Sequence, residues 1–584
     1  MKAYTALAAA LLLIVPAAGA TTAYQAILEA EEAGELTVDE TALYLTYSIL
    51  APERLPAEYA SLETERCGTP ALHEARLRLE ETSAPVRTEM LTLADRPSYG
   101  GAPVYTIDSD GGYFKVHWTD TGTHQTTETY AQEIADAADV AWETEIDEMG
   151  YYAPPSDQGI GGDEKYDIYV RNLPGTTLGY CTCAGEPSDP TTPNNDKASH
   201  IVMSTDVNYS TRICTVSHEF QHACQFAADA AEATWFMENC AVWIEEQVWP
   251  EIDDYLMYTS CEGGLRRPMW DIRTSPGGLY HYGAFTYPWF MENSISVESV
   301  LEVWQNCADV WGRNTLEAGM EMFENHGTNF ENAFMFYGYY RWCTAGNWYD
   351  GCDLYDSEAS TWYPGPLVLT EHNITELPDS LFDYIGVAGD TYEIECYGIH
   401  YYKIDLTDYQ DGWVTFDFDG RDNFEWNIAS IMYDESGNSS FSWYDVEAPA
   451  NEISLTVEGN GWDYAVIFPA FMSDTGLDPY YEGSITYSTG AAGGAVTPST
   501  LALSVSANPL TTAGSVTVDL PQAGMAELRV FDMSGRRVAT LCRDELTAGT
   551  HSFGLNELDL GTGTYLFNVV SGNSSATAKA VLVR

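Results

Sequence analysis

The sequence predicts a multidomain protein: an α+β unit, preceded by a helical segment and followed by a β-sandwich and a second small β-domain. A chain of 584 residues is long enough for several domains. Helix signals dominate residues 21–97, and alternating strand patterns dominate from residue 366 onward. The predicted units are, in order, a signal peptide (1–20), the helical segment (21–97), the α+β unit (98–365), the β-sandwich (366–490), a linker (491–502) and the last β-domain (503–584).

The N-terminus has the pattern of a signal peptide. Lys2 precedes a short apolar run, and Ala18 and Ala20 form a small-x-small cleavage pattern. The run is too short to span a bilayer, and no other stretch is long and apolar enough to do so. We therefore expect an exported chain with no transmembrane segment after cleavage.

The composition is strongly acidic, with 25 Lys and Arg against 88 Asp and Glu and a net charge of −63. Such a surface repels phosphate and excludes nucleic-acid binding. A solubilising acidic surface is the favoured explanation, while adaptation to high salt and calcium binding stay open. Twelve cysteines in an exported chain predict disulfides, and Cys343 and Cys352 are close enough in sequence for a small clasp.

The helical segment carries two start signals. Thr37 and Glu40 have capping-box spacing, and Pro70 stands at the favoured first turn of a further helix. Because this small helical unit directly follows the signal peptide, its place in the chain is that of a pro-segment.

The α+β unit begins with the strand signal "GGYFKVHW". A long helix follows, with Gly150 placed to end it. "YDIYV" (166–170) and "HIVMS" (200–204) read as further strands, and the segments around "TVSHEFQHACQF" and "TWFMENCAVWIEEQVW" read as helices. The residues expected on one face of the long helix are Ile134, Ala138, Trp142, Ile146 and Met149.

After residue 366 the pattern changes to strands. "WVTFDFDG", "WNIASIMYD", "ISLTVEG" and "YAVIFPAF" alternate between turns of Gly, Asn and Asp, as in a β-sandwich. The acidic "FDFDGRDN" leaves a Ca²⁺ site open, although solvated turns explain it more simply. "STGAAGGAVTPST" is a flexible linker, and "SVTVDL", "AELRVFD", "TYLFNVV" and "TAKAVLV" predict the last β-domain.

The segment "HEFQH" predicts a metal site. Residues four apart lie on the same face of a helix, so His218 and His222 can bind one ion, and Glu219 is placed to take a proton from a water at that ion. A catalytic zinc needs a third protein ligand. Glu238 is the preferred candidate, and Glu245 is the alternative.

These two helices resemble the gluzincin branch of zinc metallopeptidases, in which an H-E-x-x-H helix precedes a W-x-x-E-G-x-A helix that supplies the third ligand. Trp235, Glu238 and Ala241 match the second motif, and Asn239 replaces its Gly. The resemblance implies a zincin-like fold, one Zn²⁺ and peptidase activity. Many gluzincins carry an acidic residue four places after the ligand Glu, where this chain has Val242, so another residue must orient the zinc-bound histidines.

Residues 35–365 are also similar to a group of secreted bacterial metallopeptidases through "FKVHW", "GGDEKYDIYV", the zinc helix and a later Tyr-Gly. From that Tyr-Gly, the resemblance implies that Tyr282 donates to the oxyanion, with His281 as the alternative. Glu219 is the expected general base. "HIVMS" is expected to be an edge strand that pairs with an extended peptide substrate.

"TERCGTP" (64–70) resembles the cysteine switch of matrix metallopeptidases, in which an Arg-Cys-Gly segment places its thiolate on the zinc. The resemblance implies that Cys67 keeps a zymogen inactive until the helical segment is removed. An ordinary disulfide at Cys67 is the alternative.

The C-terminal segment resembles the sorting domain of type IX secretion substrates. The matching features are Asn508-Pro509, Leu520-Pro521, "VFDMSGRRV", Ala548-Gly549 and Tyr565. The resemblance implies a small Ig-like domain that engages the export machinery, with a plain accessory module as the alternative.

Together these features predict a zinc endopeptidase of bacterial origin that is secreted or attached to the outer-membrane surface. We expect it to be monomeric, to be made as a zymogen, and to act on protein or peptide substrates. Two alternatives stay open: a surface adhesin with a degenerate peptidase domain, and a zinc amidase that acts on cell-wall peptides.

Overall fold

The computed structural model describes residues 21–582 with internal gaps, so the predicted signal peptide (1–20) lies outside the described residues. The gaps are 190, 193, 256–257, 259–267, 274–279, 311, 345–369, 375–378, 386–393, 435–438, 447–448, 450, 475–478, 490–500, 506–514, 533–535, 556–557, 559, 562 and 573.

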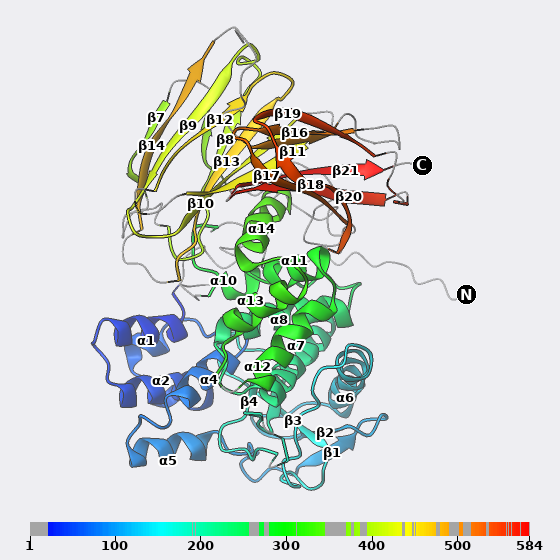
Figure 1. The fold of residues 1–584 in the computed structure, drawn as a ribbon. Helices are drawn as coiled ribbons and strands as arrows, with labels where there is room; N and C mark the ends of the chain where they lie inside the picture. Colours follow the sequence, from blue (N-terminus) through cyan, green and yellow to red (C-terminus); the bar gives the residue numbers. More distant parts are fainter. Residues whose placement is uncertain are drawn as a thin grey trace.

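The N-terminal helical segment is helical, as the sequence predicts, and lies beside the central helices (Figure 1). The capping box of Thr37 and Glu40 is confirmed, and Pro70 stands in a first turn. Apolar side chains of this segment share a core with Tyr169, Tyr180 and Val202 of the adjoining sheet. Its helices are α1 (Ala23–Glu32), α2 (Val38–Leu50), the short 3₁₀ turn Pro52–Arg54, α3 (Ala57–Ala60), α4 (Thr69–Leu77) and α5 (Ala84–Leu93).

The sheet of the α+β unit has the order β1-β2-β3-β5-β4. Strands β2, β3 and β5 are parallel, whereas β1 and β4 run antiparallel to their neighbours. Its strands are β1 (Tyr105–Asp108), β2 (Phe114–Trp118), β3 (Tyr166–Arg171), β4 (Gly179–Thr182) and β5 (His200–Ser204).

The prediction that "HIVMS" forms the edge strand is wrong. This segment is β5, which is buried along its whole length and pairs with β3 on one side and β4 on the other. The two edge strands are β1 and β4. Strand β4 lies next to β5, and its four residues "GYCT" are too few to give an alternating pattern in the sequence.

Helix α6 (Glu128–Trp142) packs on this sheet and continues as a π-helical turn (Glu143–Glu148) that ends at Gly150, where φ is +88°. Helix α7 (Tyr209–Ala228) packs against α6, α8 (Thr234–Val248), β4 and β5. The helices that follow are α10 (Tyr280–Gly283), α11 (Thr286–Ser294), α12 (Glu298–Asp309), α13 (Thr315–Asn325) and α14 (Phe330–Thr344).

The C-terminal half is rich in β-sheet, and its strands form sheets with nine, four and three members. The nine-stranded sheet contains strands of both predicted β-domains. Strand β11 of the predicted sandwich pairs with β21 of the last β-domain, with Phe441 opposite Thr577. The two predicted β-domains are therefore joined by a ladder, which the sequence does not indicate because strand partners leave no local pattern. The predicted linker lies mostly outside the described residues.

The strands of this half fall in two groups. The first group is β6 (Thr370–Ile374), β7 (Asp379–Ile385), β8 (Tyr401–Asp405), β9 (Trp413–Gly420), β10 (Trp426–Tyr433), β11 (Ser439–Val446), β12 (Glu452–Glu458), β13 (Tyr464–Phe471) and β14 (Tyr481–Ser488). The second group is β15 (Ala502–Val505), β16 (Ser515–Leu520), β17 (Gly524–Asp532), β18 (Arg537–Leu546), β19 (Gly549–Gly554), β20 (Gly563–Ser571) and β21 (Ser574–Leu582).

Disulfides are predicted from the cysteine count, but the structure differs. The cysteines whose side chains are described are free thiols, and most of them are buried in the core as small apolar side chains. The predicted clasp between Cys343 and Cys352 lies outside the described side chains. The described free cysteines are Cys67, Cys181, Cys183, Cys214, Cys224, Cys240, Cys307, Cys396 and Cys542.

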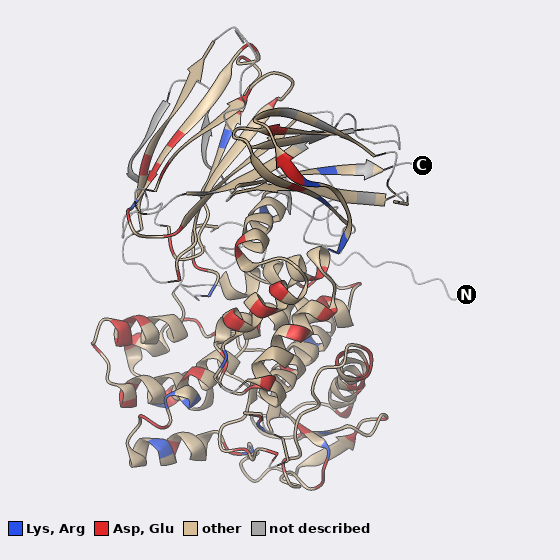
Figure 2. Cartoon of the chain, in the orientation of Figure 1, with Lys and Arg blue, Asp and Glu red and all other residues tan. Residues whose placement is uncertain are grey.

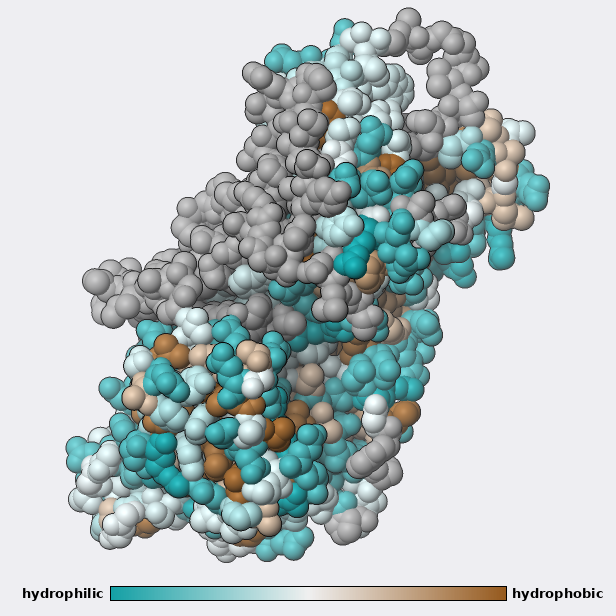
Figure 3. Space-filling model, turned by 90° about the vertical axis from the view of Figure 1, so that its left-hand side faces the viewer, coloured by the Kyte–Doolittle hydropathy of each residue, from teal (hydrophilic) through white to brown (hydrophobic). Residues whose placement is uncertain are grey.

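Asp and Glu residues are spread over the helices and strands, and Lys and Arg residues are few (Figure 2). On the face seen in Figure 3, hydrophobic residues are interspersed with hydrophilic ones. The spread of acidic residues along the chain fits a solvated acidic surface. Among the described residues, no helix combines the length and the apolar character that a membrane span requires.

Arg96 marks where the α+β unit begins. Its guanidinium lies 2.6 Å from Asp157, 3.0 Å from Glu186 and 3.8 Å from Asp167, and only 11% of its side chain is exposed. Nearby, Tyr99 donates a hydrogen bond to the His117 carbonyl oxygen. Arg96 and Tyr99 therefore stabilise the sheet. A proteolytic cleavage that leaves the α+β unit intact must lie before Arg96.

Arg96→Ala is expected to lower the free energy of unfolding by about 3–5 kcal/mol, because it removes a cation from among three carboxylates that are largely buried. Urea denaturation measures this change. Arg54→Ala is the matched control, since Arg54 and Glu89 form an exposed pair that should contribute at most about 1 kcal/mol. Equal effects of the two substitutions would contradict the assignment of Arg96 to the folded unit.

Candidate metal centre

Helix α7 presents the two histidines. Asn208 caps its N-terminus by accepting a hydrogen bond from the Thr211 amide, and the helix is buried along most of its length. His218 and His222 lie one turn apart, with ring centroids separated by 5.0 Å. Glu238 comes from α8, which packs directly on α7. Two adjoining helices thus bring the three predicted ligand residues to one place.

The ligand atoms of these residues converge. His222 Nε2 lies 3.1 Å from Glu238 Oε1, and His218 Nε2 lies 3.3 Å from Glu238 Oε2. Cys67 Sγ lies 3.5 Å from His222 Nε2, and the four donor atoms all lie within 4.8 Å of one another. Ligands at about 2.0–2.3 Å from a tetrahedral ion are separated by about 3.3–3.8 Å. The three shortest separations lie close to this range, so the cluster could hold one metal ion.

The hydrogen bonding also fits a cation. His218 Nε2 and both carboxylate oxygens of Glu238 are buried but have no hydrogen bond of acceptable geometry, although nitrogen and oxygen lie close together. Leaving such groups unsatisfied is costly, and a shared metal ion would satisfy them. The residues present therefore fit zinc, and the donor set of nitrogen, oxygen and sulfur is one that zinc accepts.

The outer nitrogens of both histidines are held by neighbouring side chains. His218 Nδ1 lies 2.7 Å from Glu245 Oε1, and His222 Nδ1 lies 2.8 Å from Gln225 Oε1. Both acceptors fix the proton on Nδ1 and leave Nε2 to face the centre. Glu245, the alternative third ligand, thus contacts the far side of His218 and supplies the orienting acid that Val242 cannot.

Glu219 lies beside the same centre. Its Oε2 accepts a hydrogen bond from the Thr69 hydroxyl at 3.0 Å, and the Cys67 thiol lies 3.5 Å from it. Burial raises the pKa of the Glu219 carboxyl above its ordinary value, although His218 and His222 oppose this shift. A raised pKa brings a carboxyl closer to the range that suits a general base.

Tyr282 and His281 are both buried near the metal centre. The Tyr282 hydroxyl accepts a hydrogen bond from the Cys67 amide at 3.1 Å, and its ring centroid lies 6.2 Å from that of His218. Burial raises the pKa of Tyr282 well above its ordinary value, so the hydroxyl keeps its proton. The His281 ring is tilted against the Tyr282 ring, and their centroids lie 4.1 Å apart. Of the two candidates, Tyr282 contacts the segment that covers the centre.

That segment, residues 64–69, is called the latch segment here. It lies along the edge strand β4: Gly68 donates to the Gly179 carbonyl oxygen at 2.9 Å, and Leu178 donates to the Arg66 carbonyl oxygen at 2.7 Å. Thr69 Oγ1 accepts from the Cys181 amide at 2.9 Å. A segment of the chain itself thus occupies the edge at which a peptide could pair.

Gly179 allows helix α7 to approach β4 closely on its other side. A Cβ atom at this position would lie 2.9 Å from Glu219 Oε1 and 3.1 Å from Thr215 Cγ2. Sequence reasoning missed the roles of Gly179, Thr69 and Gln225. Thr69 and Gln225 lie within segments that the sequence singles out, but neither motif assigns them a role, and Gly179 lies outside both.

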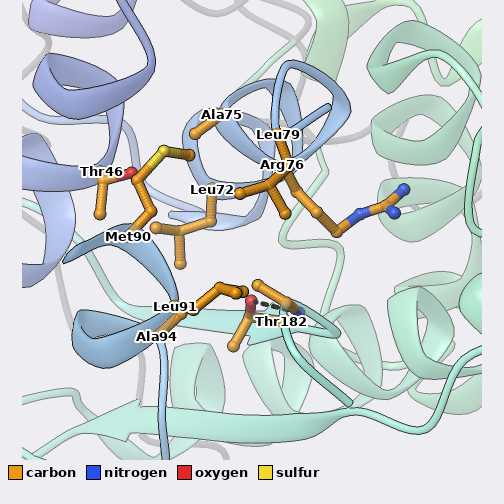
Figure 4. Close-up of a pocket in the computed structure, with 10 residues that line it drawn as sticks. Thr46, Leu72, Ala75, Arg76, Leu79, Met90, Leu91, Ala94 and Thr182 are labelled. Carbon is orange, nitrogen blue, oxygen red and sulfur yellow. Dashed lines mark hydrogen bonds between the residues drawn. The ribbon is translucent and has the colours of Figure 1, made fainter. Parts of the chain in front are cut away.

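The helices beyond the latch segment pack closely on β4. Figure 4 shows a small cavity at this interface, lined by Thr46 of α2, Leu72 of α4, Met90 of α5 and Thr182 of β4. Its volume is about 10 Å³, which is room for about one water molecule. The N-terminal helical segment is therefore held against the α+β unit by packed apolar side chains as well as by the latch segment.

The C-terminal part of the chain matches the family described as the secretion system C-terminal sorting domain, over residues 507–583. This is the type IX sorting domain expected from the sequence, so the protein is secreted or attached to the outer membrane of a bacterium and engages the secretion machinery. No curated protein matches the chain. Among solved structures, the glycoside hydrolase domain of Endo-D from Streptococcus pneumoniae R6 aligns at 13% identity over 35% of this chain and 36% of that one, with a TM-score of 0.12. That likeness is too slight to bear on fold or activity.

Glu245→Gln is expected to weaken zinc binding by about 10–100-fold, because the amide supplies a weaker acceptor to His218 Nδ1. Competition with a chromophoric chelator measures the affinity. Glu251→Gln, which neutralises an exposed acid just beyond the same helix, is the control and should change it by less than about twofold. Equal affinities for the Glu245 variant and the unchanged chain would contradict the orienting role.

Proposed function

We propose that this protein is a secreted zinc-dependent endopeptidase. His218, His222 and Glu238 hold the zinc, and Glu219 is the general base. The proposal is supported by one observation above all: three buried ligand atoms converge without satisfying one another, and a carboxylate stands beside them. The gluzincin-like pair of motifs lends the same support from the sequence.

When bound, zinc supplies a Lewis acid that activates water and polarises a carbonyl group. Glu219 accepts the proton of the attacking water and then donates it to the leaving amine. The Tyr282 hydroxyl keeps its proton and donates a hydrogen bond to the carbonyl oxygen as that oxygen gains negative charge. The edge of β4, where the latch segment now lies, holds the extended substrate.

In the proposed inactive form, the latch segment blocks both parts of this centre. Cys67 places its sulfur beside the ligand atoms, and Thr69 occupies the Oε2 oxygen that Glu219 needs to accept a proton. In the metal-free chain, burial raises the pKa of the Cys67 thiol, and Glu219 and Glu238 add to this shift. Zinc binding would therefore be accompanied by release of the thiol proton.

Cys67→Ser in the full-length chain is expected to raise hydrolysis of casein at least about tenfold over the unchanged chain, because a hydroxyl is a far weaker zinc ligand than a thiolate. Cys183→Ser, which alters a buried thiol of the α+β unit, is the control and should leave the rate unchanged. A Cys67 variant as inactive as the unchanged chain would count against the latch.

The catalytic assignment is tested in the full chain that carries Cys67→Ser, with and without Glu219→Gln. The Gln variant should keep about one zinc per chain by elemental analysis and lose casein hydrolysis by at least about 100-fold, since the amide cannot accept the proton. Cell-wall peptides are assayed in parallel to separate a peptidase from an amidase. Zinc binding with no cleavage by either form would favour a binding protein, and absence of zinc would overturn the proposal.

A further inference from the structure

The latch segment shows how this chain accommodates an extended peptide next to the metal centre. Its backbone is hydrogen-bonded to β4 on both sides of Cys67, and Cys67 pairs with Gly179 in a parallel bridge. The side chain of Arg66, which precedes Cys67, therefore lies beside the ligand atoms.

The Arg66 guanidinium enters an acidic, aromatic pocket. It lies 3.7 Å from Asp254 Oδ2, and its Cζ lies 5.4 Å from the centroid of the Tyr258 ring. Only 19% of the Arg66 side chain and 17% of the Asp254 side chain are exposed. The Tyr258 ring stacks on Tyr282 at 5.1 Å, which places the pocket directly beside the proposed oxyanion donor.

The charges around this pocket favour a cation. The Asp254 carboxylate and the Tyr258 ring both lie within reach of the Arg66 guanidinium. Burial raises the pKa of Asp254, and Arg66 opposes that shift. A buried carboxylate that loses its cationic partner is strongly destabilised. When the latch segment is displaced, the Asp254 carboxylate loses its cationic partner, and another positively charged side chain can take the place of Arg66.

We propose that Asp254 and Tyr258 form a substrate subsite for an arginine or lysine side chain, which Arg66 fills in the closed form. This inference rests on the proposed peptidase function. Asp254 pairs with the cation, and the Tyr258 face covers its planar group, as expected for guanidinium recognition. The enzyme is thus directed to peptides with a basic residue next to the scissile bond.

The test uses the full-length chain with Arg66→Ala and Cys67→Ser, so that the place of the Arg66 guanidinium is vacated without removal of any segment. Two peptide substrates are compared that differ only in arginine or citrulline, which has nearly the same shape and no charge. The arginine peptide should have a kcat/KM at least about 30-fold higher, and Asp254→Asn should reduce this ratio to within about threefold. Glu251→Gln, an exposed acid in the same loop, should leave the ratio unchanged.

A second arm measures binding alone. Synthetic "TERCGTP" and the same peptide with citrulline at the arginine position are titrated calorimetrically into the zinc-loaded chain and its Asp254→Asn variant. The arginine peptide should bind at least about tenfold more tightly than the citrulline peptide to the chain that retains Asp254. The two peptides should bind with similar affinity to the Asp254→Asn variant. Casein cleavage without an arginine preference would overturn the subsite and leave the peptidase standing. If no peptide is cleaved, the peptidase proposal fails, and equal binding of the two peptides then overturns the subsite as well.

Discussion

The structure depends on one constraint: several polar groups that need a positive charge are buried together between helices α7 and α8. The ligand atoms of His218, His222 and Glu238 lie within 4.8 Å of one another, and His218 Nε2 and both Glu238 oxygens have no hydrogen bond of acceptable geometry. Burying such groups is costly unless they are satisfied. Neighbouring side chains orient both histidines. Glu245 and Gln225 contact the Nδ1 atoms of His218 and His222, so that Nε2 of each ring faces the centre.

The same constraint explains the place of the N-terminal helical segment. Its latch segment supplies a sulfur to the centre, a hydroxyl to Glu219 and a guanidinium to Asp254, so that three reactive or charged groups each gain a partner. Apolar packing of the attached helices against β4 holds these contacts in place. In this view, the closed form is stable because the segment satisfies the very groups that a substrate would meet.

Local patterns predict much of this fold. The capping box at Thr37 predicts α2, and the spacing of His218 and His222 predicts a helix that carries both rings on one face. Non-local contacts could be predicted only where a family motif implies them, as for Glu238 and Cys67 at the metal centre. The edge strand β4 is too short for a pattern, and the pairing of β11 with β21 joins segments far apart in the chain. For the same reason, the contacts of Arg66 with Asp254 and Tyr258 could not be predicted from the sequence and are known only from the structure.

The most direct test of the central claim is X-ray absorption at the zinc edge on the full-length chain. Three nitrogen or oxygen ligands at about 2.0–2.2 Å and one sulfur at about 2.3 Å are expected, with the sulfur lost in Cys67→Ser. A shell without sulfur in the unchanged chain would contradict the latch, and a chain that binds no zinc would contradict the metal centre itself.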